Sequence, residues 1–237
     1  MNRDGALVAG RIALAVAYPV LAHAATARGS GALAALAIAD IALILLLPAL
    51  ARASWRAWFA LAIVALAALR LAATPYAQLP LLLVPVLFVG LVAWGFASTL
   101  RAGRVPLITR IVSALEAKEP ARLEPEIARY TRRLTGVWAA VLSILAAVDF
   151  ALALLAVPRG LLATFGIATP WPVGERLWSW CANGATYGLI GGLMVAEFAW
   201  RAHRFPARYH GPLDFARRLA ALGPGFWSGL FRGGSPR

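Results

Sequence analysis

The polar residues that could do chemistry are scattered through long apolar stretches. They are Arg11, His23, Asp40, Arg70, Asp149, Asn183, Tyr187 and Glu197. A charge at the centre of a bilayer costs about 2.5–3.5 kcal/mol on insertion scales, so such a group needs an ion-pair partner, a proton or water. We interpret these residues either as packing pairs that hold helices in register or as a pocket that conducts a proton or a substrate.

Depth along the apolar segments predicts which of these groups meet, because a helix rises about 1.5 Å per residue. Arg11 and Glu197 both fall near the inner boundary, and we expect them to pair. Asp40 falls near the midplane. Three groups fall in the outer half, namely His23, Arg70 and Asp149. We expect the histidine or the arginine of this set to neutralise one of the two aspartates.

Sequence motifs for catalysis are lacking. The chain has no GxSxG elbow, HExxH, Walker A motif or GxGxxG turn after a strand. Its 3 histidines lack metal-ligand spacing, and the single cysteine, Cys181, lies in an apolar segment without a nearby histidine. We interpret this cysteine as a packing residue. The sequence predicts no catalytic residue, metal or cofactor, and it favours a non-enzymatic protein.

The apolar segment 177–200 has two different faces. Small residues recur every four positions, a spacing on which another helix can pack closely: Gly184, Gly188 and Gly192. Polar groups fall nearly opposite them: Asn183, Tyr187 and Glu197. The pattern predicts a helix that is packed on both sides near the centre of a bundle.

The longest polar run is the basic segment 101–136, which we call the connector. It has eight Lys and Arg residues and four Glu residues. Pro106 starts a helical pattern, with Ile108, Ile111, Val112 and Leu115 on one face and Thr109, Arg110, Ser113 and Glu116 on the other. This pattern predicts a short helix on the cytoplasmic membrane surface. A second short helix is expected over 125–134. The candidate docking residues for a partner or headgroups are Arg104, Arg110, Arg132 and Arg133.

Composition defines the elements that must hold these residues. The chain is 61% hydrophobic and 14% charged, with a mean hydropathy of +0.74, which indicates a membrane protein. We predict an all-α bundle of about six membrane helices. They cover 6–26, 31–50, 57–73, 79–100, 137–157 and 177–200. The connector separates four of them from two, and a basic tail follows over 201–237.

Charge sets the expected orientation. With both termini inside, nineteen of the 23 Lys and Arg residues face the cytoplasm and four face outward. Positive loops resist translocation, so we expect the N-in, C-in topology. The same rule explains the net charge of +13 without a nucleic-acid partner. An alternative for residues 1–24 is a cleaved signal peptide, because Ala22-His23-Ala24 has the A-x-A pattern.

Part of the chain resembles a family of bacterial integral membrane proteins from aryl polyene and xanthomonadin-type pigment gene clusters, sometimes labelled ketosynthase-related. The resemblance covers about residues 80–207. It rests on Gly103-Arg104-Val105-Pro106-Leu107-Ile108-Thr109-Arg110-Ile111, Tyr130-Thr131-Arg132-Arg133-Leu134-Thr135, Trp138, Trp178-Ser179, Asn183, Tyr187, Glu197 and Arg201 to Arg204-Phe205-Pro206. It implies a bacterial inner-membrane protein linked to polyene-type or fatty-acyl pigment lipids. It supplies no catalytic residues.

Three functions remain open from the sequence. The first is an accessory or scaffold protein that contacts anionic lipid headgroups and recruits acyl carrier protein or soluble acyl-chain enzymes through the connector and the tail. The second is a small transporter or flippase for an apolar lipid product, which uses the intramembrane aspartate and arginine groups. The third is a membrane acyl-transfer enzyme, which we rank last because the cytoplasmic face shows no acid/base pair.

Overall fold

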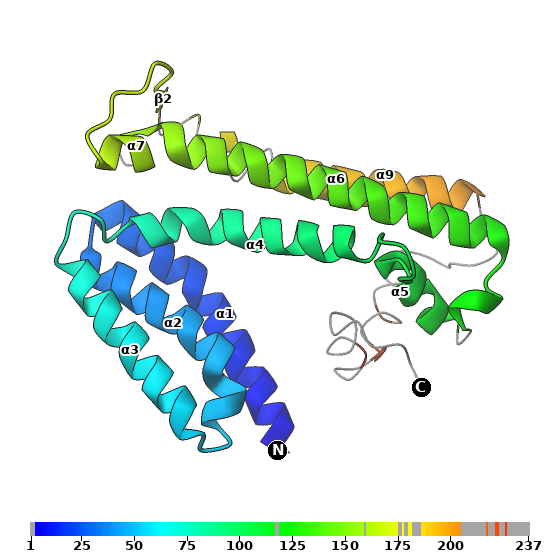
Figure 1. Ribbon diagram of the computed structural model, residues 1–237, viewed down its shortest axis with the longest axis horizontal. Helices are drawn as coiled ribbons and strands as arrows, with labels where there is room; N and C mark the ends of the chain where they lie inside the picture. The colour runs from blue at the N-terminus through cyan, green and yellow to red at the C-terminus, as the bar shows by residue number, and fades with distance from the viewer. Residues whose placement is uncertain are drawn as a thin grey trace. The chain divides into compact units, whose positions relative to one another are not determined.

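The computed structural model is almost entirely helical. It describes residues 3–116, 119–158, 160–174, 177, 180–181, 186–204, 217, 221–222 and 226. Its elements, shown in Figure 1, are α1 (Arg3–Arg28), α2 (Gly31–Leu50), α3 (Trp55–Ala72), α4 (Leu79–Ser98), α5 (Leu107–Leu115), the 3₁₀ turn η1 (Pro120–Arg122), α6 (Pro125–Leu155), β1 (Ala156–Val157), α7 (Leu161–Thr164), β2 (Val173–Gly174) and α9 (Thr186–Arg204). The predicted all-α membrane helix bundle is confirmed.

Five of the described helices are long and apolar enough to cross a bilayer: α1, α2, α3, α4 and α6. They coincide with the first five predicted spans, and the chain is a multi-pass membrane protein. The predicted sixth span, 177–200, lies partly outside the described residues. Helix α9 covers its second half and continues to Arg204, and it is not among the five candidate spans.

The boundary between connector and fifth span differs from the prediction. Instead of a short helix followed by a separate span, α6 is one helix of 31 residues. At 1.5 Å per residue it is about 46 Å long, which exceeds the roughly 30 Å of bilayer hydrocarbon. After Pro125 the helix contains no further proline, and Gly136 packs against Leu100 without interrupting it. The first turns of α6 therefore belong to the connector and orient it rigidly.

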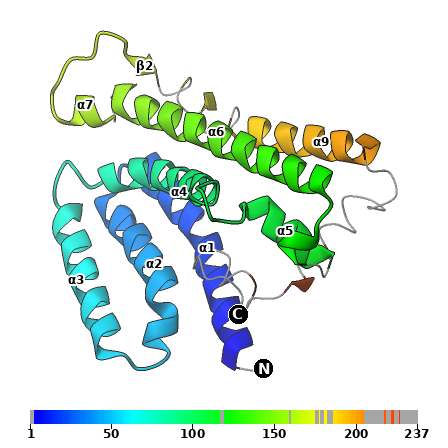
Figure 2. The same ribbon diagram turned by 45° about the vertical axis from the view of Figure 1, so that its right-hand side comes forward.

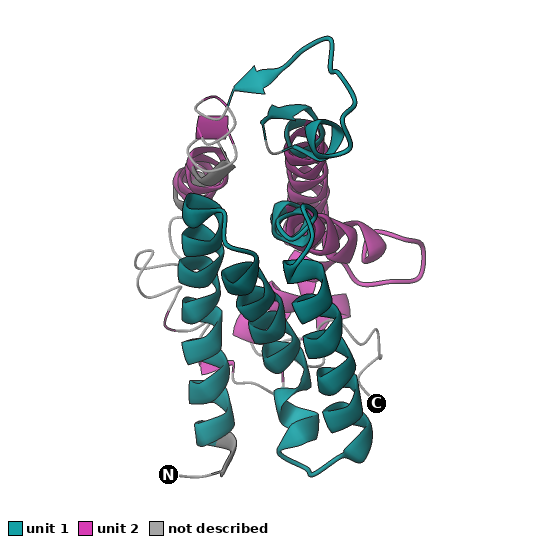
Figure 3. Ribbon diagram, turned by 90° about the vertical axis from the view of Figure 1, so that its left-hand side faces the viewer, with its two compact units in different colours: residues 1–85, 152–175 teal, residues 86–151, 176–237 magenta. Residues whose placement is uncertain are grey.

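The chain divides into two compact units, residues 1–85 with 152–175 and residues 86–151 with 176–237 (Figure 3). In the first unit, α1, α2 and α3 lie side by side in chain order (Figures 1 and 2). A buried cluster fills this unit, and it contains Ala25, Ala34, Ala37 and Leu81. Alanines allow close approach of helices, which is how membrane helices gain packing energy.

One end of the first unit is tied together by polar contacts. The Gln78 side-chain amide donates to the carbonyl oxygens of Ala25 (3.3 Å) and Ser30 (3.4 Å). The Ser30 hydroxyl caps α2, and Gly31 lies directly against the Ala72 backbone. These contacts join the starts of α2 and α4 to the ends of α1 and α3, and they fix the positions of four helices relative to one another.

The segment after α6 also belongs to the first unit. The two-residue strands β1 and β2 pair in parallel, with Ala156 opposite Val173. The ring of Phe165 stacks on Tyr76, which lies between α3 and α4, with ring centroids 5.4 Å apart. The predicted loop over residues 158–177 therefore contains a short helix, α7, and one strand, β2, and it folds back onto the α3–α4 turn.

The second unit is built on the pairing of α4 with α6. Phe96 and Trp138 are ring neighbours at 6.3 Å. Further along the pair, Gly90 leaves room for Ala146, since a Cβ on the glycine would lie 3.9 Å from the alanine side chain. Helix α9 runs beside α6 (Figures 1 and 2). These three helices position the connector.

Exposed apolar side chains lie along the outside of the helices. On α1 they recur every four residues, as one helical face: Val8, Ile12, Val16 and Val20. On α3 a similar face contains Trp55, Trp58, Phe59, Ile63, Leu66 and Leu69. Such faces match a lipid environment, where apolar side chains need no cover from the protein.

Candidate functional site at the basic connector

The connector is a folded segment, and threonine hydroxyls attach its helix α5 to α4 and α6. Helix α5 begins after Pro106, which has no side chain to cap the free backbone N–H groups of the first turn. Those groups find partners elsewhere in the second unit. The Leu107 N–H donates to the Thr99 hydroxyl (3.0 Å), and the Ile108 N–H donates to the Thr135 hydroxyl (3.3 Å). The start of α5 is therefore attached to the end of α4 and to α6.

A second contact joins the middle of α5 to α6. The hydroxyls of Thr109 and Thr131 are hydrogen-bonded at 2.8 Å. Thr131 and Thr135 are 1% and 0% exposed, and they are the largest fully buried side chains of the described chain. The hydroxyl of Thr135 in turn donates to the Thr131 carbonyl at 2.8 Å. We call these three residues, Thr109, Thr131 and Thr135, the threonine joint, and each of them is at most 4% exposed.

The orientation of α5 in the structure differs from the predicted one. We expected the face with Thr109 and Ser113 to face water and the face with Ile108 and Ile111 to contact the membrane. In the structure Thr109 and Ser113 are buried, while Ile108 and Ile111 are only partly covered. The hydroxyls change the preference because each satisfies a buried backbone or side-chain group, which an apolar side chain cannot do.

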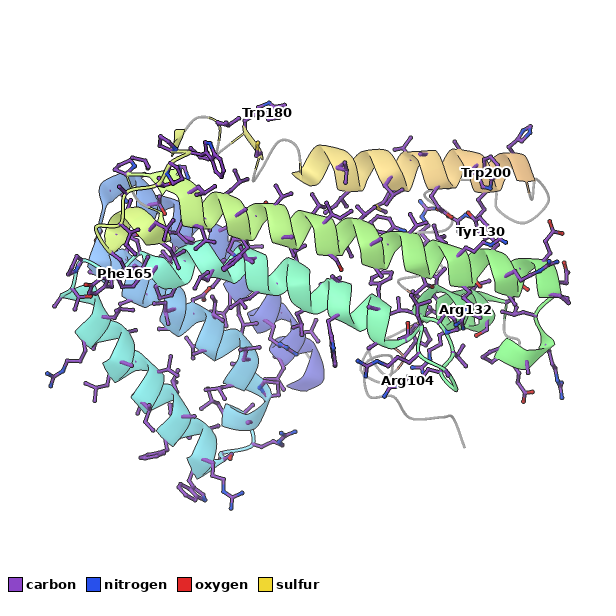
Figure 4. All side chains as sticks on the ribbon, turned by 45° about the horizontal axis from the view of Figure 1, so that its top comes forward. Arg104, Tyr130, Arg132, Phe165, Trp180 and Trp200 are labelled. Carbon is purple, nitrogen blue, oxygen red and sulfur yellow. The ribbon has the colours of Figure 1, made fainter. Side chains whose placement is uncertain are left out.

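Two of the predicted docking arginines cap α4. Figure 4 shows Arg104 and Arg132 at this end of the connector. The Arg132 guanidinium donates to the Leu100 carbonyl oxygen at 3.0 Å, and Arg104 donates to the Ser98 carbonyl oxygen at 3.5 Å. The last carbonyls of a helix lack internal partners and attract cations. Both side chains are still exposed, so they neutralise the helix end and present charge to the surface.

The remaining arginines of the connector differ in exposure. Arg133 and Arg101 are exposed, whereas Arg110 is half-buried. Arg122 pairs with Glu119 at 3.3 Å, with both side chains at least 70% exposed. An ion pair this open to water contributes little to stability. The connector thus presents arginines from the α4–α5 loop and from α6 on a fixed framework.

A buried ion pair within α9 is joined to α6 by a hydrogen bond. Glu197 accepts a hydrogen bond from the Tyr130 hydroxyl (3.1 Å) and pairs with Arg201 (3.1 Å). The two charged side chains are only 11–12% exposed, and the Arg201 guanidinium also lies 5.9 Å from the Phe198 ring centre. These partners of Glu197 lie in its own unit, whereas Arg11 is an exposed residue of the other unit, so the predicted pairing of Glu197 with Arg11 stays a prediction.

The predicted neutralisation of an aspartate is not found for Asp40. Asp40 and Asp149 are both buried, at 5% and 7% exposure. His23 and Arg70 are exposed, and among the described residues no ion pair joins either of them to Asp40. Long cationic side chains near helix ends reach towards water rather than towards the bundle.

The other predicted residues of segment 177–200 are only partly described. Asn183, Gly184 and the side chain of Tyr187 lie outside the described part of the chain. Gly188 and Gly192 are exposed, and a Cβ on either would meet no described atom within 4 Å. The described residues therefore place no helix against this part of the glycine stripe.

Sequence reasoning missed the threonines as site residues. Part of their signal was available, because Thr131 and Thr135 recur at helical spacing in an otherwise charged stretch. Threonine at such positions usually indicates hydrogen bonds back to its own helix. Only the folded chain shows that α5 uses the same hydroxyls. No cluster of His, Cys, Asp or Glu suited to a metal occurs among the described residues.

The chain matches no protein-family model, and no curated protein or solved structure is similar to it at a significant level. Its class therefore follows from the fold and the site alone. It is a multi-pass helical membrane protein with a folded, arginine-rich connector.

Proposed function

We propose that this protein is an accessory or scaffold protein of the bacterial inner membrane, which docks an acidic soluble partner on the connector. The observation that carries the proposal is the threonine joint. A connector that served only to orient the spans would need positive charge but no fixed shape. Here buried hydroxyls hold α5 against α6 while arginines on both sides remain exposed.

Electrostatics favours an acidic partner. The connector has eight positive and four negative side chains, so it carries a net charge of about +4. Complementary charge raises association rates and selects orientation more than it raises affinity. Guanidinium groups also bind carboxylates and phosphates through two parallel hydrogen bonds. The surface therefore fits a small protein with an acidic face or a phosphate-bearing group.

The resemblance to the pigment-cluster family supplies the choice of partner. It implies work on polyene-type or fatty-acyl lipids, whose chains are carried during synthesis by acyl carrier protein. We therefore infer that the docked partner is acyl carrier protein or an enzyme that handles its acyl chains. In this function the membrane protein holds the soluble machinery at the bilayer, where the apolar product leaves water.

Binding to acyl carrier protein tests the proposal. The full chain in nanodiscs should bind it with an affinity that falls as salt rises. Charge reversal at two exposed arginines, Arg101→Glu with Arg133→Glu, should weaken binding by about tenfold or more, equivalent to about 1.4 kcal/mol. The matched control is Arg52→Glu with Arg56→Glu, which changes net charge equally on the α2–α3 turn. Equal weakening by both pairs would show that net charge alone matters and would refute a docking surface on the connector.

The lipid context needs an experiment in the host. After gene deletion, lipids from separated inner and outer membranes are compared by mass spectrometry. Loss of a polyene or fatty-acyl product from both membranes is the expected result. Normal product confined to the inner membrane would favour the transporter hypothesis instead. An unchanged lipid composition in both membranes would refute the link to pigment lipids.

A further inference from the structure

Among the described residues, Asp40 has a position that helix packing does not explain. It is the only ionisable residue of α2, a helix of 20 residues from Gly31 to Leu50. At about 1.5 Å per residue, it lies about 14 Å from either end of the helix. A helix of this length spans the hydrocarbon layer, so the carboxyl group lies near the midplane.

The carboxyl group is covered by protein but not satisfied by it. Asp40 is 5% exposed, and its Oδ2 atom has no hydrogen-bond partner among the described residues. The described cationic side chains of the first unit form no ion pair with it. They are exposed side chains near the helix ends or on outer faces: Arg11, His23, Arg28, Arg52, Arg56 and Arg70. A buried carboxylate left without a partner is costly, so the site requires something that the described chain does not supply.

The opposite helix supplies one polar neighbour. Gly10 of α1 faces Leu47 of α2, and the two helices meet at the turn around Ser30. This register brings Tyr18 opposite Asp40. Tyr18 is half-buried beside the alanine cluster of the first unit, and it interacts electrostatically with the aspartate. The hydroxyl can accept a hydrogen bond from a protonated carboxyl group or donate one to the ionised form.

No other titratable group faces the pair from the described neighbours. On α1, His23 is five residues beyond Tyr18 and exposed. On α3 the ionisable residues are Arg56 and Arg70, near its two ends and exposed. Helix α4 has none. The chemistry of the site is therefore that of one carboxyl group and one phenol in an apolar hairpin.

We propose that Asp40 and Tyr18 form a reversible proton-binding site in the middle of the α1–α2 hairpin. The carboxylate takes one proton from the aqueous phase and becomes a neutral carboxylic acid, so the charge of the site changes from −1 to 0. Tyr18 keeps its proton in both states, and its hydroxyl is the polar group that α1 presents to the carboxyl group. This site does not depend on docking at the connector. It supplies the coupling chemistry that a transporter of this chain would need.

Infrared difference spectroscopy of the full chain in liposomes tests the proposal. A protonated carboxyl group has a carbonyl stretching band that an ionised carboxylate lacks. The spectrum of the wild type minus that of Asp40→Asn should show this band at acidic pH and lose it at alkaline pH. In Tyr18→Phe the same band should shift in frequency, because the polar hydroxyl near the carboxyl group is removed. Glu126→Gln, which removes an exposed carboxyl group, should leave the Asp40 band unchanged.

Each outcome has a definite meaning. A difference spectrum without the band at every pH would show that Asp40 stays ionised and would overturn the site. A band of constant intensity across the pH range would overturn reversible binding. An unshifted band in Tyr18→Phe would remove the tyrosine from the site. Circular dichroism identifies any variant that fails to fold, and if Asp40→Asn fails, wild type minus Tyr18→Phe still reports the band.

Discussion

The threonine joint allows a sharp test in the substitution Thr135→Val. Valine has nearly the same shape as threonine, so the packing at this fully buried position is retained. The change removes one hydroxyl and with it the acceptor for the Ile108 N–H of α5. The hydroxyl also donates to the Thr131 carbonyl. That carbonyl lies inside α6 and keeps its helical hydrogen bond. The main cost is therefore an unsatisfied N–H at the start of α5.

The size of the effect follows from that orphaned donor. Leaving a buried donor without a partner costs about 1–3 kcal/mol. Each 1.4 kcal/mol is a factor of about ten in an equilibrium. Local opening of α5 should thus become about 5- to 150-fold more frequent. Hydrogen exchange measured by mass spectrometry on peptides from Leu107–Leu115 reads this directly, since protected amides exchange only when the helix opens. Binding to the soluble partner should weaken too, although no charge has changed.

A control on the same helix isolates the cause. The Ser143 hydroxyl donates to the Ala139 carbonyl at 2.7 Å, which is the same bond to its own helix. No group of α5 uses it, so Ser143→Ala should leave exchange in α5 unchanged. If Thr135→Val and Ser143→Ala gave the same exchange rates over Leu107–Leu115, the joint would not be what rigidifies the connector.

Two further substitutions test packing and charge in the two units, each read by thermal unfolding of the full chain in detergent. Gly31→Ala would place a Cβ 2.9 Å from the Ala72 carbonyl carbon and closer still to its oxygen, so a loss of about 1–3 kcal/mol is expected. Gly5→Ala meets no atom within 4 Å and should stabilise instead, and equal effects of the two would contradict the close approach. Glu197→Gln removes the carboxylate that pairs with Arg201 in a site with about 11% exposure and should cost up to about 3–5 kcal/mol. Adding Arg201→Gln should restore part of that loss, and a further additive loss would argue against the pair.

Much of the fold could be predicted because hydrophobicity over a bilayer-sized window is a local signal. The second span was predicted at 31–50, and α2 covers Gly31–Leu50. Its start is visible in the sequence because Ser30 is a good helix cap and Gly29, with a positive φ of 60°, permits the turn before it. The short helix expected over 125–134 is not a separate element, because a change from charged to apolar residues does not end a helix. Nothing between 126 and 155 breaks one, so α6 continues through.

The candidate site was only partly predictable. The arginines of the connector are visible as a charge run, but two of them cap α4, which depends on where that helix ends in space. Partners of the buried charges were hard to predict for a similar reason. Equal depth in the membrane makes two residues possible neighbours, while the choice among neighbours depends on how each helix is rotated. Glu197 pairs with Arg201 of its own helix and accepts a hydrogen bond from Tyr130, and neither contact follows from depth.

The sequence by itself determined that this chain is a membrane protein and where its first five apolar helices fall. Both follow from the free energy of moving apolar segments and charges between water and hydrocarbon, a property of each segment alone. The tertiary structure decided which polar side chains are buried together. Asp40 stands out in the sequence and Thr135 does not, yet only the fold shows that the Thr135 hydroxyl caps the start of a distant helix and that the Asp40 carboxyl group has no such partner among the described residues. That difference arises because hydrogen bonds depend on distances between helices, which no single segment contains.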